Sequence, residues 1–266
     1  NRPKFRPCYN HNRQPDINIS DLAGDSINGL TYAIANSTLF RQGERYFDWQ
    51  YTQNTNNFFP RRIILGRDQT IYIGTWYGQV FKSSDHGYTW NECTKPWQDH
   101  SNYFYMNVTS DNYIWVTAWG KPLRCSRDGG QTWTTDSTGL QAGEMLGDMY
   151  RLTDGSLFFL SLNRHLSKST DDGHTWTPVE APEYTDKLYV TDKDELILFT
   201  MYGAMSIYKS SDQGETYVKK YLVGPSFSTL MDHTVHKYGK NYYVLIPGFG
   251  ILQTPDFEKF EVYWHN

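Results

Sequence analysis

The sequence predicts an all-β chain folded as a six-bladed β-propeller with four-stranded antiparallel blades. The main observation is an eight-residue pattern, Ser-x-Asp-x-Gly-x-Thr followed by Trp or Tyr, which occurs at 83–90, 126–133, 169–176 and 210–217. Its aspartates are separated by 43, 43 and 41 residues. A period of about 40–50 residues is typical of propeller blades, and short apolar or alternating runs, rather than helical periodicity, fill the intervals.

Four strand-like runs can be assigned in each unit, separated by turn residues. In the second unit they are 61–66, 70–76, 78–84 and 88–94; in the third, 103–109, 113–119, 122–126 and 131–135; in the sixth, 231–237, 241–247, 250–254 and 260–264. The first unit contains the runs 30–36, 38–42 and 46–52. Its innermost strand is expected from the polar stretch 16–24.

Stepping the repeat outward from its clear copies reaches Gln42 and Asp256, which lie in degenerate versions of the pattern. Six units of about 43 residues therefore account for nearly the whole chain. We expect one propeller domain over 1–266, with 1–15 as an N-terminal extension that completes or braces a blade.

Composition excludes several classes of partner. The 266 residues carry a formal net charge of −4 and a pI near 6.1, without the basic surface of a nucleic-acid-binding protein. No run approaches the ~18 apolar residues of a membrane span, and the sequence starts at Asn1 rather than Met, so we expect a processed or trimmed chain. Such a chain is compatible with secretion, and the expected location is secreted, periplasmic or at the cell surface. Cys8, Cys93 and Cys125 form no metal motif, so we expect no metal, no cofactor and free thiols at Cys93 and Cys125.

Each copy of the pattern falls between the third and fourth strands of its unit, so it is predicted to be a hairpin turn. The Asp side chain accepts local N–H groups, and Gly supplies a positive φ. Since no reaction needs four copies of one site, a structural role is favoured. The predicted structural residues are Asp85, Gly87, Trp90, Asp128, Gly130, Trp133, Asp171, Gly173, Trp176, Asp212 and Gly214.

The pattern resembles the Asp box of the sialidase-like, BNR-repeat propellers. The resemblance implies a superfamily of sialidases, other glycoside hydrolases, lectins and non-enzymatic assembly factors, in which the boxes lie on the face away from the active site. Sialidases of that superfamily clamp the sugar carboxylate with three arginines, one of them usually in an Arg-Ile-Pro motif. This chain has no such motif, and no arginine follows Arg164, so we do not expect a true sialidase.

The candidate site should therefore lie opposite the repeated turns. There, four turns after the second strands place an aromatic residue before Gly: Tyr77, Trp119, Tyr202 and Phe249. These rings either pack between blades or stack on sugar faces. The fourth blade departs from this rule with Asn163, Arg164 and His165, and such a departure is where function is expected.

The crossings between blades add charged candidates. Glycoside hydrolysis needs two carboxyl groups across a cleft, and the catalytic candidates are Glu144, Asp148 and Asp232; the alternative is that these are simply solvated loop carboxylates. The predicted ligand-binding residues are Arg61, Arg62, Tyr77, Trp119, Asn163, Arg164, His165 and Tyr202.

The sequence thus favours a carbohydrate-directed propeller that takes a glycan or oligosaccharide, either as a glycosidase-like enzyme or as a sugar-binding module. The alternative is a non-enzymatic scaffold that binds or assembles protein partners. A deep acid-lined pocket would favour the enzyme, an aromatic rim the lectin, and an exposed apolar patch without a pocket the scaffold.

Overall fold

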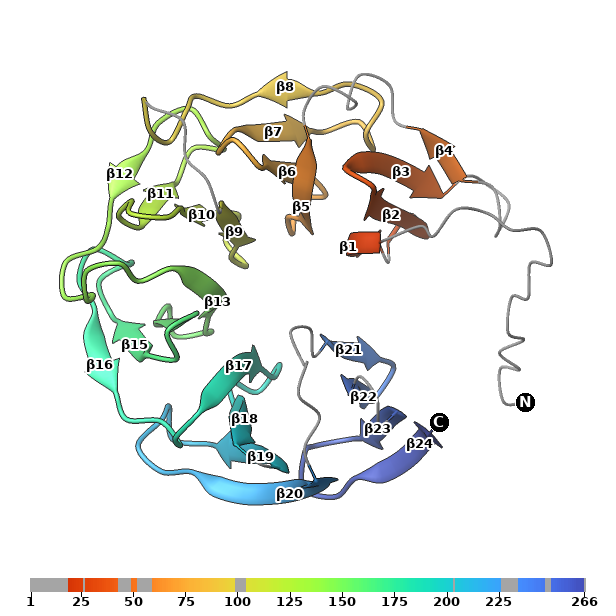
Figure 1. Ribbon diagram of the computed structural model, residues 1–266, viewed down its shortest axis with the longest axis vertical. Coiled ribbons are helices and arrows are strands. Elements are labelled where there is room, and N and C mark those ends of the chain that lie inside the picture. Colours follow the sequence, from red (N-terminus) through yellow and green to blue (C-terminus); the bar gives the residue numbers. More distant parts are fainter. Residues whose placement is uncertain are drawn as a thin grey trace.

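The computed structural model describes residues 19–25, 27–42, 49–51, 59–98, 104–202, 204–225, 234–246 and 250–265. The strands in these residues form six four-stranded antiparallel sheets arranged as blades around a central axis (Figure 1). Each blade uses four strands that are consecutive in the chain. The predicted six-bladed β-propeller is therefore confirmed.

The strand bounds place each blade in a continuous stretch of sequence. The first three blades are β1 (Ile19–Asp25), β2 (Leu30–Ala35), β3 (Thr38–Gln42), β4 (Trp49–Tyr51); β5 (Pro60–Leu65), β6 (Ile71–Thr75), β7 (Val80–Ser83), β8 (Asn91–Glu92); and β9 (Tyr105–Val108), β10 (Ile114–Thr117), β11 (Arg124–Ser126), β12 (Thr134–Thr135). The last three are β13 (Leu146–Arg151), β14 (Leu157–Ser161), β15 (Leu166–Ser169), β16 (Thr177–Val179); β17 (Thr185–Val190), β18 (Leu196–Tyr202), β19 (Ala204–Ser210), β20 (Val218–Pro225); and β21 (Thr234–Tyr238), β22 (Asn241–Ile246), β23 (Gly250–Thr254), β24 (Glu261–His265).

The first blade is complete. Its innermost strand, β1, comes from the polar stretch in which the sequence predicted it and pairs with β2 along its length. Within the described residues no strand from one end of the chain enters the blade at the other end. The predicted extension 1–15 lies outside the described residues.

The apolar core of the described residues forms five layers, each between two consecutive blades. Between the third and fourth blades, for example, Trp115 and Cys125 pack with Leu157 and Phe159. In the second, third and fourth blades the second strand is covered on both faces, and every residue of β6, β10 and β14 is buried. This explains why these runs read as continuous apolar segments.

All four copies of the repeated pattern form turns between the third and fourth strands of their blades. Asp171 accepts hydrogen bonds from Ser169 Oγ at 2.7 Å and from the Thr175 N–H at 2.8 Å, and a further bond from the Thr175 hydroxyl. The bonds from Thr175 lower the pKa of the Asp171 carboxyl to about 2. Equivalent threonine bonds lower the pKa of Asp85 and Asp212 to the same value.

The turn glycines also touch the preceding blade, which the sequence did not indicate. Gly130 has a φ of 86°, and a Cβ added to it would lie 2.4 Å from Sγ of Cys93. Gly173 and Gly214 are equally restricted, because their added Cβ atoms would lie 2.2 Å from the Trp115 ring and 2.8 Å from Val179. Glycine is required here by both backbone conformation and close packing.

The aromatic residue that closes each repeat packs in the layer between two blades rather than only within its own blade. Trp176 is buried, makes an edge contact with Trp115 at a centroid distance of 6.0 Å and donates Nε1–H to the Asp136 carbonyl at 2.9 Å. Trp133 donates in the same way to Thr94 of the preceding blade at 2.8 Å. In these two residues the aromatic body fills the interblade layer and the indole N–H is satisfied, whereas Nε1 of Trp90 is buried without a hydrogen-bond partner.

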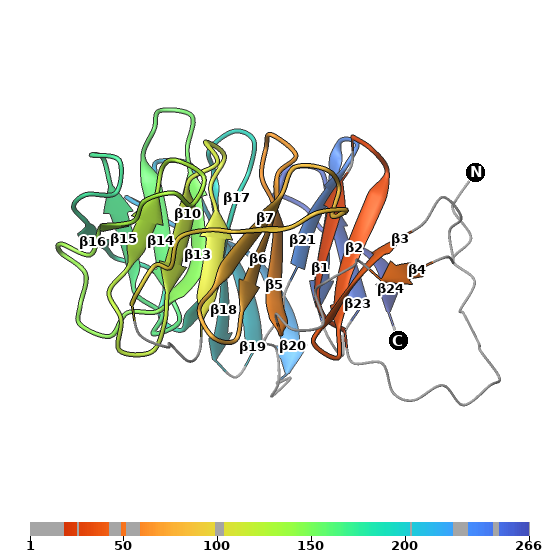
Figure 2. The same ribbon diagram turned by 90° about the horizontal axis from the view of Figure 1, so that it is seen from above.

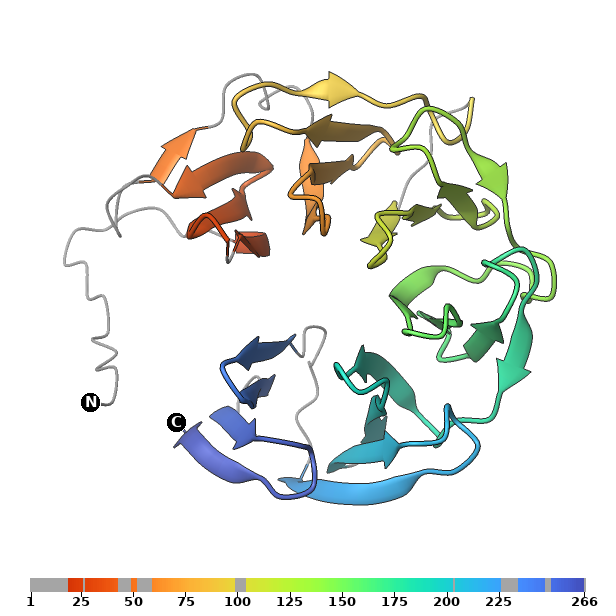
Figure 3. The same cartoon turned by 180° about the vertical axis from the view of Figure 1, so that it is seen from behind.

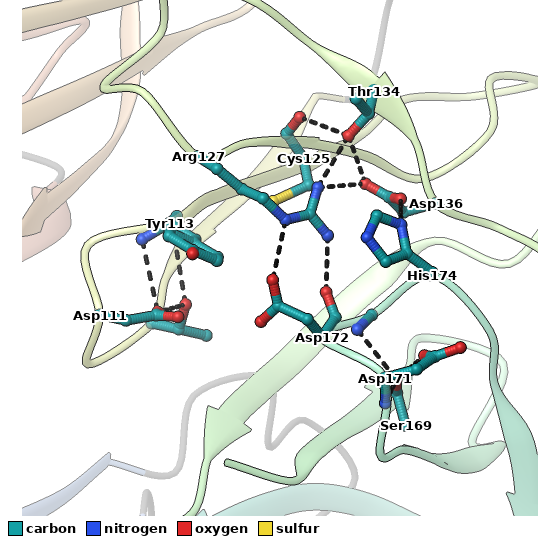
Figure 4. A network of polar contacts seen from close by, with 12 residues as sticks. Asp111, Tyr113, Cys125, Arg127, Thr134, Asp136, Ser169, Asp171, Asp172 and His174 are labelled. Atoms are coloured by element: carbon teal, nitrogen blue, oxygen red, sulfur yellow. Dashed lines mark hydrogen bonds and ion pairs between the residues drawn. The ribbon is translucent and has the colours of Figure 1, made fainter.

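A cation on the third strand of one blade reaches an oxygen in the repeated turn of the next. The bonds are Arg41 to His86 O at 3.3 Å, Lys82 to Gly129 O at 2.6 Å, Lys168 to Gln213 Oε1 at 2.6 Å and Lys209 to Asp256 O at 3.0 Å. In the third blade Cys125 takes the lysine position, and Arg127 of the turn instead donates to Asp172 O (Figure 4). We call these five contacts the interblade clamps.

Both cysteines in the described residues are buried free thiols, as predicted. Burial raises the pKa of the Cys93 thiol to about 11, so it is not a reactive thiolate. Cys8 lies outside the described residues.

Candidate functional site

The two faces of the ring carry different turns (Figures 1 and 3 show them in turn). The hairpins after the first and third strands, including the repeated turns, emerge on one face, which we call the repeat face. The hairpins after the second strands and the crossings between blades emerge on the other, the crossing face; Figure 2 shows the ring edge-on with hairpins at both. This division follows from the up-and-down order of the strands in each sheet.

A hollow of about 250 Å³ opens on the crossing face at the fourth blade, and we call it the fourth-blade hollow. It lies between the crossing that enters this blade and the crossing that leaves it. Its polar lining consists of Gln141, Glu144, Arg164, His165, Ser167 and Glu183; its other lining residues are Gly139, Leu166, Pro178, Val179, Ala181, Pro182 and Tyr184. Three of the predicted site residues, Glu144, Arg164 and His165, therefore meet in one concavity.

The backbone that follows Glu144 is fixed by bonds to two neighbouring strands. The Met145 carbonyl accepts the N–H of Leu162 at 2.9 Å, and the Leu146 N–H donates to Thr117 Oγ1 at 2.8 Å. The first bond ties the crossing to the end of β14, and the second ties it to the third blade. Glu144 is thereby held at the rim of β13 with little freedom to move.

The Glu144 carboxylate is buried but only half satisfied. Its side chain is 4% exposed, and Oε1 accepts a hydrogen bond from Nδ1 of His165, which is half exposed. Oε2 is buried and has no partner. A buried carboxylate oxygen without a donor is costly, and here it belongs to a residue that lines the hollow.

The β14–β15 turn carries Arg164 and His165 and has the same backbone hydrogen bonds as its counterpart in the second blade. The Ser161 N–H donates to the His165 carbonyl at 2.9 Å, as the Thr75 N–H donates to the Gln79 carbonyl at 3.0 Å. The two turns can therefore be compared position by position.

Arg164 occupies the position that glycine takes in the sister turns. Its φ is 70°, beside 79° for Gly78 and 69° for Gly120. A side chain in this left-handed region costs about 1 kcal/mol or more, and such strain concentrates at functional sites. The fourth blade thus holds an arginine at a position where glycine is less strained.

The Arg164 guanidinium is oriented by the crossing that leaves the fourth blade. Its Nε donates to Asp186 Oδ1 at 2.6 Å, and its Cζ lies 5.7 Å from the centre of the Tyr184 ring. Burial raises the pKa of the Asp186 carboxyl above its usual value, against the opposing effect of Arg164. The guanidinium is half exposed and lies at the hollow with further N–H groups beyond the one that binds Asp186.

A second hollow, of about 650 Å³, lies against the fifth blade, and we call it the fifth-blade hollow. It shares the segment 181–184 with the fourth-blade hollow. Three glutamates line it, Glu180, Glu183 and Glu215, against one lysine, Lys219.

Two other predicted residues form contacts between inner strands. Asp148 accepts the Leu188 N–H at 2.9 Å through Oδ2, and its Oδ1 pairs with Lys187 Nζ at 2.8 Å, so both oxygens are occupied. Arg62 lies 3.5 Å from Asp21 of the first blade. The catalytic role of Asp148 stays a prediction, but its contacts join β13 to β17.

The remaining predicted ligand residues do not line either hollow. Arg61 lies over the Trp76 ring at 4.3 Å and the Tyr105 ring at 5.0 Å, and Tyr77 makes an edge contact with Phe59. Trp119 is 67% exposed, and Asn163 is exposed beside Arg164. Asp232 and Phe249 lie outside the described residues, as does the side chain of Tyr202.

Sequence reasoning missed the segment 180–186, which comprises the crossing and the first two residues of β17. It supplies Asp186 to Arg164 and places Glu183 and Tyr184 at the hollow. The sequence did contain a usable signal. This crossing follows the fourth blade, whose turn departs from the aromatic-Gly rule, and the crossing and the turn lie on the same face of the ring.

Within the described residues there is no group of three or more His, Cys, Asp or Glu side chains that could hold a metal ion. In the same part of the chain no helix is long and apolar enough to cross a membrane.

Comparisons with known proteins identify the class of fold. A family model described as the DUF6242 beta propeller domain matches residues 122–227, from the third blade into the fifth. No curated protein gives a significant match.

Several solved structures are similar. A catalytically inactive virginiamycin B lyase from Staphylococcus aureus with quinupristin has a TM-score of 0.69 at 14% identity, over 93% of this chain and 84% of that one. YCF48 bound to D1 peptide has a TM-score of 0.64 at 16% identity, over 86% and 75%. An ancestral GH74 enzyme has a TM-score of 0.63 at 14% identity, over 93% of this chain but 38% of that one. At these identities the likeness shows the propeller fold alone.

Proposed function

We propose that the protein is a carbohydrate-binding propeller and that one sugar unit of its ligand occupies the fourth-blade hollow. The observation that carries this proposal is the hollow itself, in which Glu144, Arg164 and His165 meet and Glu144 holds His165 through Oε1. The half-exposed Arg164 and His165 side chains offer hydrogen-bonding groups to sugar hydroxyls.

The rest of the lining suits a sugar. Arg164 offers N–H donors to ring or hydroxyl oxygens, and Pro182 and Tyr184 offer apolar surface to the C–H face of a pyranose. A volume of about 250 Å³ lies below the roughly 300–1,000 Å³ of pockets that hold drug-sized ligands. The hollow therefore suits a single sugar ring.

Binding is favoured over hydrolysis because of how the carboxylates are used. Glu144 is engaged with His165, and both oxygens of Asp148 are engaged with β17. Glu183 lines the same hollow as Glu144, so hydrolysis is retained as an outcome for the test to decide.

The test is a glycan array followed by calorimetry and hydrolysis assays on the glycans that bind. Glu144→Gln and Arg164→Ala should each weaken binding by about 1–3 kcal/mol, as expected for loss of a charge-assisted hydrogen bond. Arg67→Ala, an exposed arginine on the repeat face, is the control and should bind as the unaltered protein does. Binding that persists in both site variants would place the sugar elsewhere.

A protein-binding scaffold is the second candidate, and an exposed aromatic group favours it. Phe59, Trp76 and Tyr77 are 45%, 43% and 47% exposed on the crossing face of the second blade. The similar YCF48 structure is bound to a peptide. If no glycan binds and Trp76→Ala abolishes capture of a peptide ligand selected from a displayed library, this second function replaces the first.

A further inference from the structure

Resting on the proposed function, we infer that the protein also catalyses a reaction in the fourth-blade hollow: hydrolysis of a small acyl ester, such as an acetyl group, on the bound sugar. His165 is the general base that activates water, Glu144 positions its imidazole ring, and Arg164 stabilises the oxyanion that forms. Three observations support this inference.

The first observation is the orientation of the His165 ring. Its Nδ1 is bonded to Oε1 of the buried Glu144 carboxylate. A carboxylate can only accept, so Nδ1 carries the proton and Nε2 of the neutral ring keeps its lone pair. Within the described residues Nε2 has no hydrogen-bond partner, and the half-exposed ring lines the hollow. A base with this orientation and access can take a proton from a water molecule in the hollow.

Glu144 stabilises the protonated base as well as orienting it. When Nε2 takes a proton the ring becomes an imidazolium, and the adjacent carboxylate stabilises that charge. Oε2 of Glu144 is buried, so a sugar in the hollow reaches the imidazole ring rather than the carboxylate. This arrangement favours chemistry by His165 over glycoside hydrolysis, in which a carboxyl group must itself reach the sugar.

The location of this pair distinguishes it from another histidine–carboxylate pair in the chain. Nδ1 of His174 lies 3.0 Å from Oδ1 of the buried Asp136 (Figure 4). His174 belongs to a repeated turn and lines neither hollow, and Asp136 is also bound by Arg127. The pair with Asp136 joins two blades, whereas the ring held by Glu144 lies open to a ligand.

The second observation is the guanidinium next to the base. Arg164 precedes His165 in the same turn, and its Nε donates to Asp186. Within the described residues its Nη1 and Nη2 have no hydrogen-bond partner, and Arg164 lines the hollow. Oriented N–H donors stabilise the negative oxygen of a tetrahedral intermediate. Such a role explains why this turn holds an arginine at a φ of 70°, where its sister turns have glycine.

The third observation is the charge of the lining, which favours a neutral substrate. Glu183 also lines the hollow, and Asp186 offsets the charge of Arg164. An acidic sugar would therefore meet no excess of positive charge, which disfavours elimination from a uronic acid, another reaction that uses a base and an arginine. A neutral ester becomes charged only in the intermediate. At about 250 Å³ the hollow suits one sugar ring with a small acyl group.

The reaction needs only water besides the ester. Nε2 of His165 takes a proton from water while the water oxygen bonds to the acyl carbon, and the carbonyl electron pair moves onto the oxygen that Arg164 binds. The carbonyl group then re-forms, the bond between the acyl carbon and the sugar oxygen breaks, and the proton on Nε2 passes to that sugar oxygen. The products are a carboxylic acid and a free sugar hydroxyl.

Water rather than a serine is the nucleophile in this scheme. Ser167 also lines the hollow, but it is buried. Within the described residues the partners of His165 are Ser161, through its backbone and its hydroxyl, and Glu144. No bond joins His165 to Ser167, so no acyl group should be found on the protein during turnover.

The experiment measures acetate release from methyl glycosides of glucose, galactose, mannose and xylose that each carry one O-acetyl group. Hydrolysis of para-nitrophenyl acetate, an ester without a sugar, is measured separately. His165→Gly should lower kcat by about 100-fold or more, as expected for loss of a general base. Added imidazole should raise the activity of this variant by at least about ten-fold, which a purely structural histidine would not show.

Two further variants complete the experiment. Glu144→Gln should lower kcat at saturating ester by about 10- to 1,000-fold, and imidazole should not restore it because His165 is still present. His174→Gln is the matched control, since it removes a histidine that is also paired with a buried carboxylate but lies on the repeat face. It should hydrolyse each ester as the unaltered protein does.

The outcomes separate the two proposals. Sugar binding in calorimetry with no hydrolysis of any ester overturns the esterase activity and leaves the proposed function in place. Hydrolysis of para-nitrophenyl acetate that depends on His165, with no sugar bound or deacetylated, supports the base but overturns the sugar ligand. Equal rates in His165→Gly, or an acetyl group on Ser167, overturn the role given to His165. If nothing is bound or hydrolysed, both proposals are wrong.

Discussion

The Nη2 group of Arg127 donates to the main-chain oxygen of Asp172 at 2.6 Å, and this bond joins the third blade to the fourth. The same guanidinium donates to Asp172 Oδ2 at 3.1 Å and to Asp136 Oδ2 at 3.0 Å. In three other blades a lysine one residue before the repeated turn supplies the interblade clamp. Here Cys125 stands at that position, and an arginine two residues later has taken over the contact.

Arg127→Ala should lower the free energy of unfolding by about 2–4 kcal/mol, because it leaves the buried Asp136 carboxylate without this guanidinium and removes the bond to Asp172. Arg127→Lys should recover less than half of the loss, since the three N–H groups of lysine share one nitrogen and cannot reach the acceptors that Nε, Nη1 and Nη2 of arginine bind. Urea unfolding measures both, with the exposed Arg67→Ala as control. A stable Arg127→Ala protein would show that the clamp contributes little.

Gly130→Ala should destabilise the chain far more than Gly120→Ala, although both glycines have positive φ. An added Cβ at Gly120 meets nothing within 4 Å, so only backbone strain of about 1 kcal/mol is expected. At Gly130 the Cβ would lie 2.4 Å from Cys93 Sγ, and we expect about 3 kcal/mol or more. Thermal unfolding of the two variants gives the difference, and Cys93→Ala should recover part of it. Equal losses would contradict an interblade contact.

Acid should destabilise the protein because it protonates the aspartates of the repeated turns. Hydrogen bonds from threonine lower the folded pKa of Asp85, Asp171 and Asp212 to about 2, below the 3.8 of an unperturbed carboxyl. The unfolded chain then binds more protons, so this stability is complete above pH ~4 and is lost as pH falls toward 2. Urea midpoints between pH 5 and 2.5 should fall steeply for the unaltered chain and less steeply for Asp171→Asn. If the urea midpoints of the two proteins fell equally with pH, Asp171 would not contribute to acid unfolding.

Arg164→Gly should leave stability unchanged or raise it by up to about 1 kcal/mol, because glycine relieves the strained φ of 70° while the exposed pair with Asp186 contributes little. The same change should weaken glycan binding, since the guanidinium is lost. Chemical unfolding and calorimetry on one preparation test both halves. A destabilised variant with full affinity would mean that Arg164 serves the fold.

Asp148→Asn distinguishes a role in catalysis from one in the fold. Its two oxygens bind Leu188 N–H and Lys187, so we expect a loss of about 1–3 kcal/mol in stability and unchanged affinity for sugar. If the protein hydrolyses a glycan and this variant stays stable yet inactive, Asp148 is catalytic, as the sequence first suggested.

The strand order could be predicted because the hydrogen bonds that form each repeated turn join residues that are close together in the sequence. Asp171 with Ser169 and Thr175 needs only neighbours in sequence, so the eight-residue pattern alone indicates the turn. Its recurrence then fixed the blade boundaries, and even the weak first strand fell where the period required it.

The site was only partly predictable, because its contacts join residues from different blades. The departure at Arg164 was visible in the sequence, but its partner Asp186 and the nearby Tyr184 follow no repeat. Likewise, nothing in the eight-residue pattern shows that Gly130 must be small for the sake of Cys93. The sequence repeat indicates the features that all blades have in common, whereas the proposed site is made of residues that are particular to one blade and its neighbours.

The interblade clamps also bear on how such a chain changes over evolutionary time. They fasten the ring on the repeat face, while the fourth-blade hollow is built on the crossing face from a turn and two crossings. Under the proposed function, substitutions in those segments would change the ligand that is bound while the interblade clamps still hold the ring together. Substitutions there can therefore accumulate at little cost to folding. We expect the sequences of relatives to differ most at the positions of Arg164 and Asp186.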